Sequence, residues 1–372
     1  MKITIFGDIC PTKDTMRAFE SGNCHNVFGE VLKEIDTSDI VIGNLECAVT
    51  DNPTPIQKSG PVLYTRSKAI HALKGFDVLS LANNHIRDCG DEGVLTALET
   101  CKNLGIKTLG AGLNLEAARQ PLLIEKHGLK IGVMSFAEQE FNIANENRSG
   151  ACYLDMYDDF DRIREFRKTV DYLIILYHGG IEYFPFASPE LSRKCHKLVD
   201  CGADLVTCQH SHCIGTIEKY KDSVIVYGQG NSVFGYRSGD ESWNQGLLLQ
   251  VDIIDNNSKM VSYKGITATN EGLKFLPEEK QNLLEKQLLE RETISAEDIE
   301  KEWNVFCEKL GRIHMPLLLG WPKLLIAINR RTNNLLLKLF MNKKRFNNTH
   351  NLIRCEAHRE IIETLLKKKD YS

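Results

Sequence analysis

Chemically active side chains follow short apolar runs at several places in the sequence. Each of these runs ends in a carboxylate, an amide or an imidazole. In chain order the residues are Asp8, Asn44 with Glu46, Asn84 with His85, Glu138 with Glu140, His178 with Glu182, His210 with His212, and Asn231. Carboxylates, amide carbonyls and neutral imidazoles form a mixed nitrogen and oxygen ligand set. Such a set suits Mn, Fe, Co, Ni or Zn better than Ca or a thiolate zinc site.

The number of these residues exceeds what one catalytic zinc ion requires. A tetrahedral catalytic zinc uses three protein ligands and keeps one position open. Two metal ions about 3.5–4 Å apart, bridged by a carboxylate, use the set more fully. His210 and His212 share one face of an extended strand, because side chains alternate along it. Two plainer readings stay open: Asn83-Asn84 as a turn with Asn in a left-handed conformation, and His178 as a core histidine.

Nine apolar runs predict strands, and four amphipathic stretches predict helices. The predicted strands are 2–8, 39–46, 77–85, 130–140, 171–180, 204–212, 223–231, 247–254 and 260–266; the predicted helices are 27–36, 91–104, 158–169 and 189–201. Continuous apolar strands alternating with helices indicate an α/β fold whose sheets are buried between helical layers. Ligands in open α/β sheets bind beyond the carboxyl ends of the strands. We therefore expect the chemically active residues to converge there.

The chain changes character after about residue 270. Its 372 residues are 42% hydrophobic, enough for a sizeable core. We predict a domain at 1–270 and a mainly helical, basic region at 271–372, where Leu, Lys, Glu and Arg dominate. Ser295-Ala296-Glu297-Asp298 resembles a capping box and predicts a helix from about residue 296. The formal net charge of the whole chain is −4. From Lys301 onward the net charge is +9, so residues 1–300 carry a net charge of about −13.

Several protein classes are disfavoured by composition. The twelve Cys include no CxxC pair, and the apolar stretch after Met1-Lys2 is too short for a signal peptide. We expect a cytoplasmic protein, peripheral to the membrane at most. The acidic body and the lack of a recognised motif argue against nucleic acid. The Leu-rich basic stretch 333–346 suits an anionic membrane surface or an acidic polymer; a helix docked on the body is the alternative.

Six short motifs occur in order within roughly residues 1–250. They are Gly7-Asp8, Asn44-Leu45-Glu46, Asn83-Asn84-His85 with Asp88 and Gly90, His178-Gly179-Gly180-Ile181-Glu182-Tyr183, Gln209-His210-Ser211-His212 and Gly228-Gln229-Gly230-Asn231-Ser232-Val233-Phe234. The series resembles the CapA family of capsule and poly-γ-glutamate synthesis proteins, which is similar to the calcineurin-like metallophosphoesterases. The resemblance implies a layered α/β/β/α sandwich with a helical C-terminal appendage. It also implies a dinuclear metal-dependent hydrolase of phosphoesterase type, acting in capsule polysaccharide or poly-γ-glutamate biosynthesis.

The resemblance assigns six ligands to two divalent first-row ions (Mn, Fe or Zn). Glu46 stands at the position of the bridging carboxylate. The first ion would take Asp8 and His212 as its other ligands. The second ion would take the remaining three residues, Asn84, His178 and His210.

Other residues would act around the ions. The resemblance implies that His85 is not a ligand but faces the substrate as general acid or oxyanion partner. The residues expected to orient ligands or contact substrate are Asn44, Asp88, Glu182, Asn231 and Cys10. The expected substrate is a phosphoester or a polymer-linked group. Capsule-assembly proteins, or a membrane surface contacted through the basic C-terminal region, are the expected partners.

Two positions depart from the phosphoesterase pattern. Cys10 stands where a His is usual, and Glu46 replaces the usual Asp. Cys10 would either ligate as a thiolate or pack as a small buried apolar residue. Weakening of the first site would favour a second hypothesis, a non-catalytic metal-containing component of a capsule-assembly complex. A third hypothesis, a nucleotide-directed phosphatase, would need a stacking pocket from Phe184, Phe186 and Tyr236.

Overall fold

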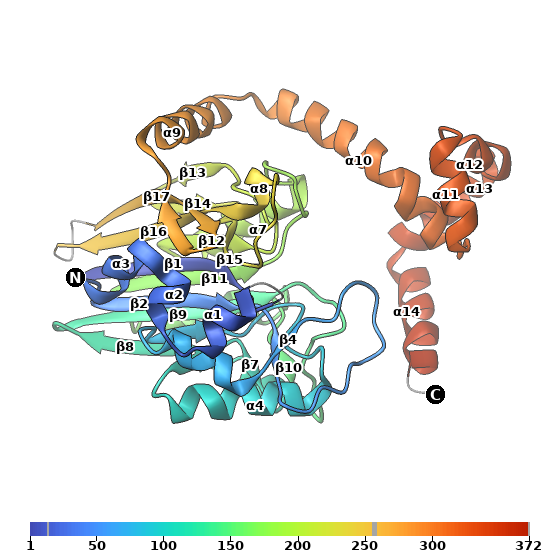
Figure 1. Cartoon of the computed structure of the whole chain (residues 1–372). Coiled ribbons are helices and arrows are strands. Elements are labelled where there is room, and N and C mark those ends of the chain that lie inside the picture. The colour runs from blue at the N-terminus through green and yellow to red at the C-terminus, as the bar shows by residue number, and fades with distance from the viewer. Residues whose placement is uncertain (13–14, 255–258, 371–372) are drawn as a thin grey trace. The chain divides into compact units, whose positions relative to one another are not determined.

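The protein divides into two compact units, Met1–Ser295 and Ala296–Ser372. The computed structural model, drawn in Figure 1, describes residues 1–12, 15–254 and 259–370. The first unit contains two large β-sheets, and the second consists of helices. Each unit is described by itself below.

The first large sheet has eight strands and mixed topology. Its order is β18 (Gly272–Phe275), β17 (Lys259–Thr269), β16 (Gln245–Ile253), β1 (Lys2–Ile9), β2 (Ile40–Leu45), β5 (Val78–Ser80) and β6 (Lys107–Leu109), with β15 (Asn231–Val233) also paired to β1. Strands β1, β2, β5, β6 and β15 run parallel to one another, whereas β16, β17 and β18 add an antiparallel edge. The parallel strands therefore end at one edge of this sheet.

The second large sheet has six strands. Its order is β13 (Ile217–Tyr220), β14 (Ser223–Val226), β12 (Leu205–Gln209), β11 (Tyr172–His178), β9 (Leu129–Ala137) and β8 (Leu122–Lys126). The four central strands are parallel, and the two edge strands are antiparallel to their neighbours. Two short pairs lie outside these sheets: β3 (Ala48–Val49) with β4 (Tyr64–Thr65), and β7 (Ala111–Gly112) with β10 (Gly150–Ala151).

Three clusters of buried side chains define the layers of the first unit. The central cluster joins the two sheets and includes Ile3 and Ile42 from the first and Ile131 and Ile174 from the second. The other two clusters pack helices onto the outer faces: α1 (Met16–Glu20), α2 (Cys24–Phe28), α3 (Leu32–Asp36) and α4 (Gly90–Asn103) on the first sheet, α6 (Asp159–Arg167) and α7 (Pro189–Asp200) on the second. The predicted α/β/β/α sandwich is confirmed.

Local sequence explains where α7 begins and why one predicted helix is broken. Ser188 caps α7 by accepting a hydrogen bond from the Leu191 N–H, with Pro189 in the first turn. The predicted helix 27–36 is instead α2, a 3₁₀ turn and α3. The break falls at Gly29, whose φ is +47° and where a Cβ would collide with the Leu273 carbonyl oxygen of β18. Tertiary packing therefore overrides the helical pattern.

The division between the units falls later than composition suggested. The strand β18 and the helix α9 (Glu278–Glu292) follow residue 270 yet belong to the first unit. Leu284 and Leu288 of α9 join the inter-sheet cluster, which accounts for this membership. The second unit begins with α10 (Ala296–Leu318), at the predicted start, and continues with α11 (Lys323–Arg331), α12 (Leu335–Phe340), α13 (Lys343–Arg354) and α14 (Glu356–Asp370). Within the described residues, every helix is too short or too polar to cross a bilayer.

Candidate metal centre

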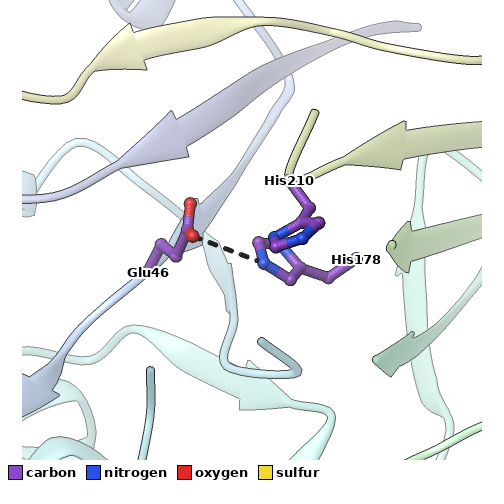
Figure 2. A group of neighbouring side chains, drawn as sticks. All are labelled: Glu46, His178 and His210. Atoms are coloured by element: carbon purple, nitrogen blue, oxygen red, sulfur yellow. Dashed lines mark ion pairs between the residues drawn. The ribbon is translucent and has the colours of Figure 1, made fainter. Parts of the chain in front are cut away.

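The parallel strands of both sheets bring the predicted ligands together at their carboxyl ends. Asp8 of β1 pairs in register with Asn44 of β2, and Glu46 follows β2 directly. His178 ends β11 beside Gln209, the last residue of β12. Figure 2 shows Glu46, His178 and His210 approaching one another from these separate segments. The convergence expected from the strand ends is observed.

Two groups of three side chains have the geometry of metal sites. One comprises Glu46, His178 and His210; the other comprises Asp8, Glu46 and His212. Within each group the potential ligand atoms all lie within 4.8 Å of one another, and every member is buried. Glu46 belongs to both groups. This is the arrangement that a bridging carboxylate between two cations requires.

The Glu46 carboxylate is buried without a hydrogen bond from the described residues. It is 0% exposed, and neither oxygen has a hydrogen-bond partner among them. The nearest cation-forming group is the His178 imidazole, whose Nε2 lies 3.4 Å from Oε1 (Figure 2). Burial, with further contributions from neighbouring carboxylates, raises the pKa of Glu46 well above its usual range. A buried, unpartnered carboxylate is costly to keep, and cations on either side would remove that cost, so the residues fit a two-metal site.

The predicted strand 204–212 ends at Gln209 as β12, so the prediction that His210 and His212 share one face of an extended strand is wrong: both follow the strand in a strained backbone conformation. His210 has φ +88° and His212 has φ +51°, a region that non-glycine residues seldom adopt and that costs about 1–3 kcal/mol. The His210 Nδ1 is buried and has no partner among the described residues. Burial lowers the pKa of His210 well below its usual range and that of His212 to about 3. Both imidazoles are therefore neutral near pH 7, the form that binds metal.

Asp8 is fixed by two donors. One carboxylate oxygen accepts a hydrogen bond from the Asn44 amide at 2.7 Å, and the other accepts from the His210 backbone N–H at 2.9 Å. Burial and the nearby Glu46 raise the pKa of Asp8 to about 7. The Asn44 amide nitrogen also lies 3.1 Å from Nδ1 of His178. Asn44 therefore orients one candidate ligand from each three-residue group.

The Asn83-Asn84-His85 motif combines a turn with a directed side chain. The Asn83 side chain accepts a hydrogen bond from the His85 backbone N–H at 3.1 Å, an Asx turn. The Asn84 amide oxygen lies 3.1 Å from Nε2 of His178. Its amide nitrogen lies 3.5 Å from Glu140. The turn hypothesis thus describes Asn83, whereas Asn84 faces the group that contains His178 and His210.

His85 belongs to a buried network that includes a residue the motifs did not indicate. Its Nδ1 lies 2.6 Å from one oxygen of Asp88, and the Lys58 ammonium lies 2.6 Å from the other. The side chains of Lys58 and Asp88 are 2% and 1% exposed. Burial lowers the pKa of His85 despite the opposing effect of Asp88. Donation from Nδ1 to Asp88 leaves Nε2 of a neutral imidazole as a proton acceptor.

The remaining predicted residues take different places. Asn231 accepts a hydrogen bond from Nδ1 of His212 at 2.9 Å, which orients that ring. Burial raises the pKa of Glu182, whereas His85 and Arg237 act to lower it. Glu138 accepts from the Gly180 N–H at 3.2 Å and thereby supports the loop after β11.

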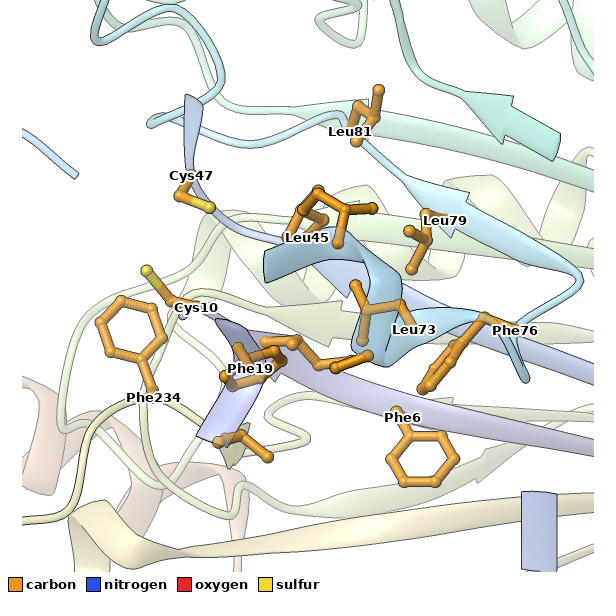
Figure 3. Close-up of a cluster of buried hydrophobic side chains, with 14 of the residues drawn as sticks. Phe6, Cys10, Phe19, Leu45, Cys47, Leu73, Phe76, Leu79, Leu81 and Phe234 are labelled. Carbon is orange, nitrogen blue, oxygen red and sulfur yellow. The ribbon is translucent and has the colours of Figure 1, made fainter. Parts of the chain in front are cut away.

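Cys10 lies in the apolar cluster beneath the first sheet. Figure 3 shows it beside Phe234 and near Cys47, and it is fully buried. It belongs to neither three-residue group of the described chain. Burial and the neighbouring Cys47 thiol raise its pKa well above the usual value. This environment matches the hypothesis of a packed apolar residue.

Aromatic rings border the centre on the His212 side. The His212 ring lies 4.8 Å from both Phe234 and Trp243. Tyr183 lies 6.5 Å from His212 and 6.4 Å from Trp243, and it is 48% exposed. Phe184 and Phe186, two of the residues hypothesised to stack on a nucleotide base, instead contact each other. Their ring centroids lie 5.7 Å apart, and Phe184 is buried. No motif or spacing in the sequence indicated Trp243, which lies beyond the last of the six motifs.

Curated relatives and solved structures are similar to this chain over about two thirds to three quarters of its length. The capsule biosynthesis protein CapA of Bacillus anthracis is 26% identical over 275 residues, covering 70% of this chain and 66% of that protein. The PGA biosynthesis protein CapA of Bacillus subtilis (strain 168) is 28% identical over 251 residues, covering 66% and 65%. The chain therefore spans just under two thirds of the length of each relative.

The solved structures are more distant. A novel phosphatase of Mycoplasma pneumoniae aligns with a TM-score of 0.42 and 13% identity, over 74% of this chain and 90% of that one. A 5'-nucleotidase precursor of Thermus thermophilus aligns with a TM-score of 0.43 and 14% identity, over 78% and 57%. Likenesses at this level leave the chemistry of the site undecided. Residues 2–236 match the family described as bacterial capsule synthesis protein PGA_cap, and the chain belongs to that family.

Proposed function

We propose that this protein is a metal-dependent hydrolase of phosphoesterase type that acts in capsule polysaccharide or poly-γ-glutamate biosynthesis. The observation that carries the proposal is the Glu46 carboxylate, which is fully buried, has no hydrogen-bond partner among the described residues and is common to two groups of potential ligands. Membership of the capsule synthesis family supports the biological role. The substrate is then a phosphoester or a polymer-linked group.

The residues present would hold two divalent first-row ions. Asp8 and His212 would serve one ion, His178, His210 and Asn84 the other, and Glu46 both. Bound there, the ions would supply an activated water and offset negative charge on the phosphoryl oxygens. Strained backbone at His210 and the Asn44 hydrogen bonds hold these ligands in place beforehand. Such preorganisation limits the reorganisation needed when substrate binds.

His85 supplies the acid–base function. Asp88 fixes its Nδ1, so Nε2 is the atom left for the reacting group. Because burial lowers the pKa of His85, the imidazole is neutral in the free protein and must take up a proton before it can donate one. A dianionic phosphoester favours that uptake when it binds close to the ring. His85 then protonates the leaving oxygen.

Metal stoichiometry tests the proposal. We would purify the full chain without chelator or histidine tag, reconstitute it with Mn, Fe or Zn, and quantify metal per chain. Wild type should hold about two ions, and Glu46→Gln and His210→Ala should hold fewer. His127→Ala is a matched control, because its ring lies on the surface and pairs with Asp39 at 2.8 Å. Wild type that stays empty after reconstitution would refute the proposal; a loaded protein would next be screened with phosphoesters.

One observation favours a second candidate, a non-catalytic metal-containing component of a capsule-assembly complex. Cys10 stands where the phosphoesterase pattern has a His and packs in the apolar cluster, which leaves one ion with only three potential ligands, Asp8, Glu46 and His212. A metal-loaded protein that turns over none of a broad set of phosphoesters would favour this candidate. It would be favoured further if His85→Ala retained the protein's role in capsule formation.

A further inference from the structure

An arginine at the rim of the metal centre has a position that metal binding does not explain. The Arg237 guanidinium lies over the Trp243 indole, 3.1 Å from the ring centroid. Trp243 in turn contacts the His212 ring, with centroids 4.8 Å apart. After burial and the His178 and His85 imidazoles, the positive charge of Arg237 also acts to lower the pKa of His212. Arg237 is therefore next to the centre without being a potential ligand.

The backbone and the stacking surface of Arg237 are both fixed. The Asn244 side chain accepts from the Arg237 N–H at 2.9 Å and donates to the Arg237 carbonyl at 2.7 Å. The Trp243 indole N–H donates to the Phe234 carbonyl at 3.0 Å, and the ring is buried. A stacked arginine loses less conformational entropy when it binds an anion. The local structure thus preorganises the guanidinium.

The hydrogen-bonding capacity of Arg237 is only weakly used. Within the described chain, its one ion pair is with Asp240, at 3.9 Å, and both side chains are 44% exposed. An exposed pair at this distance contributes little. Stacking on Trp243 uses the face of the guanidinium and leaves its N–H donors in the plane. These donors can bind a carboxylate or phosphate in bidentate fashion.

Tyr183 forms the other side of this rim. It lies 6.4 Å from Trp243 and 6.5 Å from His212, and its ring is 48% exposed. Its φ of +62° is unusual for a tyrosine, and its N–H donates to the Ser211 carbonyl at 2.8 Å. An exposed aromatic ring in a strained, hydrogen-bonded position indicates a contact surface.

We infer that Arg237, Trp243 and Tyr183 form a subsite for a second anionic group of the substrate. Resting on the proposed function, this inference places the reacting phosphoester at the metals and a carboxylate or second phosphate on Arg237. Tyr183 covers the atoms between the two groups. The substrate class is therefore a phosphoester that carries a second anionic group nearby, rather than the phosphate ester of an uncharged alcohol. When the substrate binds, its anionic group replaces Asp240 as the ion-pair partner of Arg237.

Binding of paired phosphonates tests the subsite without turnover, because phosphonates resist hydrolysis. The carboxylate pair is 2-amino-4-phosphonobutyrate and 3-aminopropylphosphonate, which differ by one carboxylate. The second-phosphate pair is propane-1,3-diphosphonate and propylphosphonate. Calorimetry on the zinc-loaded full chain would give the affinity ratio within each pair. Wild type should prefer the additional anion by about tenfold in at least one pair, as expected for a charge-assisted hydrogen bond.

Three variants locate that preference. Arg237→Gln should reduce the ratio to below twofold, and Arg237→Lys should retain part of it, because lysine keeps the charge but not the bidentate geometry. Arg193→Gln is the matched control: Arg193 is exposed, pairs with Glu190 on α7, and should leave the ratio unchanged. Metal content and thermal midpoint would verify that Arg237→Gln is folded.

Each outcome decides the inference. A ratio near one in wild type, or an unchanged ratio in folded Arg237→Gln, overturns it, as does failure of every phosphonate to bind. Loss of the carboxylate preference alone, or of the phosphate preference alone, identifies which anion the subsite takes. If no phosphoester is ever hydrolysed but the preference depends on Arg237, the subsite stands and the hydrolase proposal fails. If a phosphoester is hydrolysed but Arg237→Gln retains the affinity ratio, the hydrolase proposal stands and the subsite fails.

Discussion

Glu46 shows how one side chain can link two potential ion sites. Its carboxylate reaches both three-residue groups although it replaces the shorter aspartate that the phosphoesterase pattern has at this position. Both oxygens are buried among neutral imidazoles and a second carboxylate, Asp8. Without cations this arrangement holds two acids in a space that favours their protonated forms. Occupancy of the centre should therefore depend on proton release.

The affinity for metal should rise with pH. Asp8 has a pKa of about 7, and the pKa of Glu46 is raised well above normal, so each must lose a proton to ligate. Burial already keeps His212 neutral, with a pKa of about 3, and it adds no dependence in this range. Affinity should fall by about tenfold per pH unit, or more, as pH drops below 7. Zinc titration against a competing chelator at pH 5.5, 6.5 and 7.5 measures this; constant affinity would contradict it.

Replacing His85 separates catalysis from metal binding. His85→Ala should retain the metal content of wild type, because the ring belongs to neither ligand group. Turnover of a phosphoester should fall by about 10²–10⁴-fold, the usual contribution of a positioned acid. Metal analysis and steady-state kinetics on the same sample measure both. Full activity in the variant would remove His85 from the mechanism, whereas lost metal would make it part of the metal centre.

Lys58 should be important for stability. Its ammonium is buried against Asp88, which also accepts from the Leu63 N–H at 2.7 Å. Lys58→Met leaves the Asp88 carboxylate buried without its cation, which should cost about 3–5 kcal/mol in the free energy of unfolding. Urea unfolding measures the loss, and adding Asp88→Asn should recover part of it. Lys168→Met is the control, because the Lys168–Glu165 pair is exposed; equal losses in the two single variants would contradict the prediction.

At the scale of elements, the site depends on close packing of strand ends. Gly7 precedes Asp8 in β1, and a Cβ there would collide with the Gly230 carbonyl oxygen just before β15. Gly7→Ala should push β15 away from β1 and cost about 1–3 kcal/mol. It should also weaken metal binding, because Asn231 of β15 orients His212.

Thermal or urea unfolding and metal titration of Gly7→Ala measure both effects. Gly311→Ala is the matched control: Gly311 lies inside α10, and an added Cβ meets no atom within 4 Å. That variant should gain up to about 1 kcal/mol from helix propensity. A Gly7→Ala protein as stable as wild type would show that the strand ends can separate without loss.

The sequence was most informative where local pattern and burial coincide. The predicted strands at 2–8, 39–46, 171–180 and 204–212 are β1, β2, β11 and β12, because strands buried on both faces are continuously apolar. Their ends located the candidate ligands for the same reason. The predicted strand 77–85 ends earlier, as β5 at Ser80, because Asn83 forms a turn.

Residues whose roles depend on tertiary contacts left no local signal. Lys58 lies in the irregular segment between β3 and β4, and only its contact with Asp88 connects it to the site. Arg237 and Trp243 are likewise joined to the centre through the His212 ring. The helix predicted at 27–36 is broken because Gly29 packs on β18, about 240 residues later in the chain. Neither periodicity nor spacing can report such contacts.

At the scale of the whole molecule, the candidate centre lies entirely within the first unit. All of its residues precede residue 245, and the cluster between the sheets is completed by α9. The expected cytoplasmic location, and the partners expected for the basic C-terminal region, stay predictions. The negative charge of the first unit also places an attractive field around a cation site.

A chain of residues 1–295 should fold and bind metal by itself. Its two sheets, their helices and α9 form one compact unit, so its unfolding should be cooperative. A chain ending at residue 270 should be less stable, because it lacks β18 and α9. Circular dichroism melts and metal content of both proteins measure the difference. Similar melting of the two chains would mean that α9 is dispensable.

The hydrogen bond from the His210 N–H to Asp8 joins residues 202 positions apart in the sequence. Contacts of such long range form slowly, because a large loop must close before they contribute any energy. During synthesis, Asp8 and Glu46 leave the ribosome long before β12 and β15 exist to complete the centre. A metal ion therefore cannot guide the early steps of folding. On the proposed function, metal would secure a sandwich that has already assembled, so the supply of metal should affect the lifetime of the finished protein and not its rate of folding.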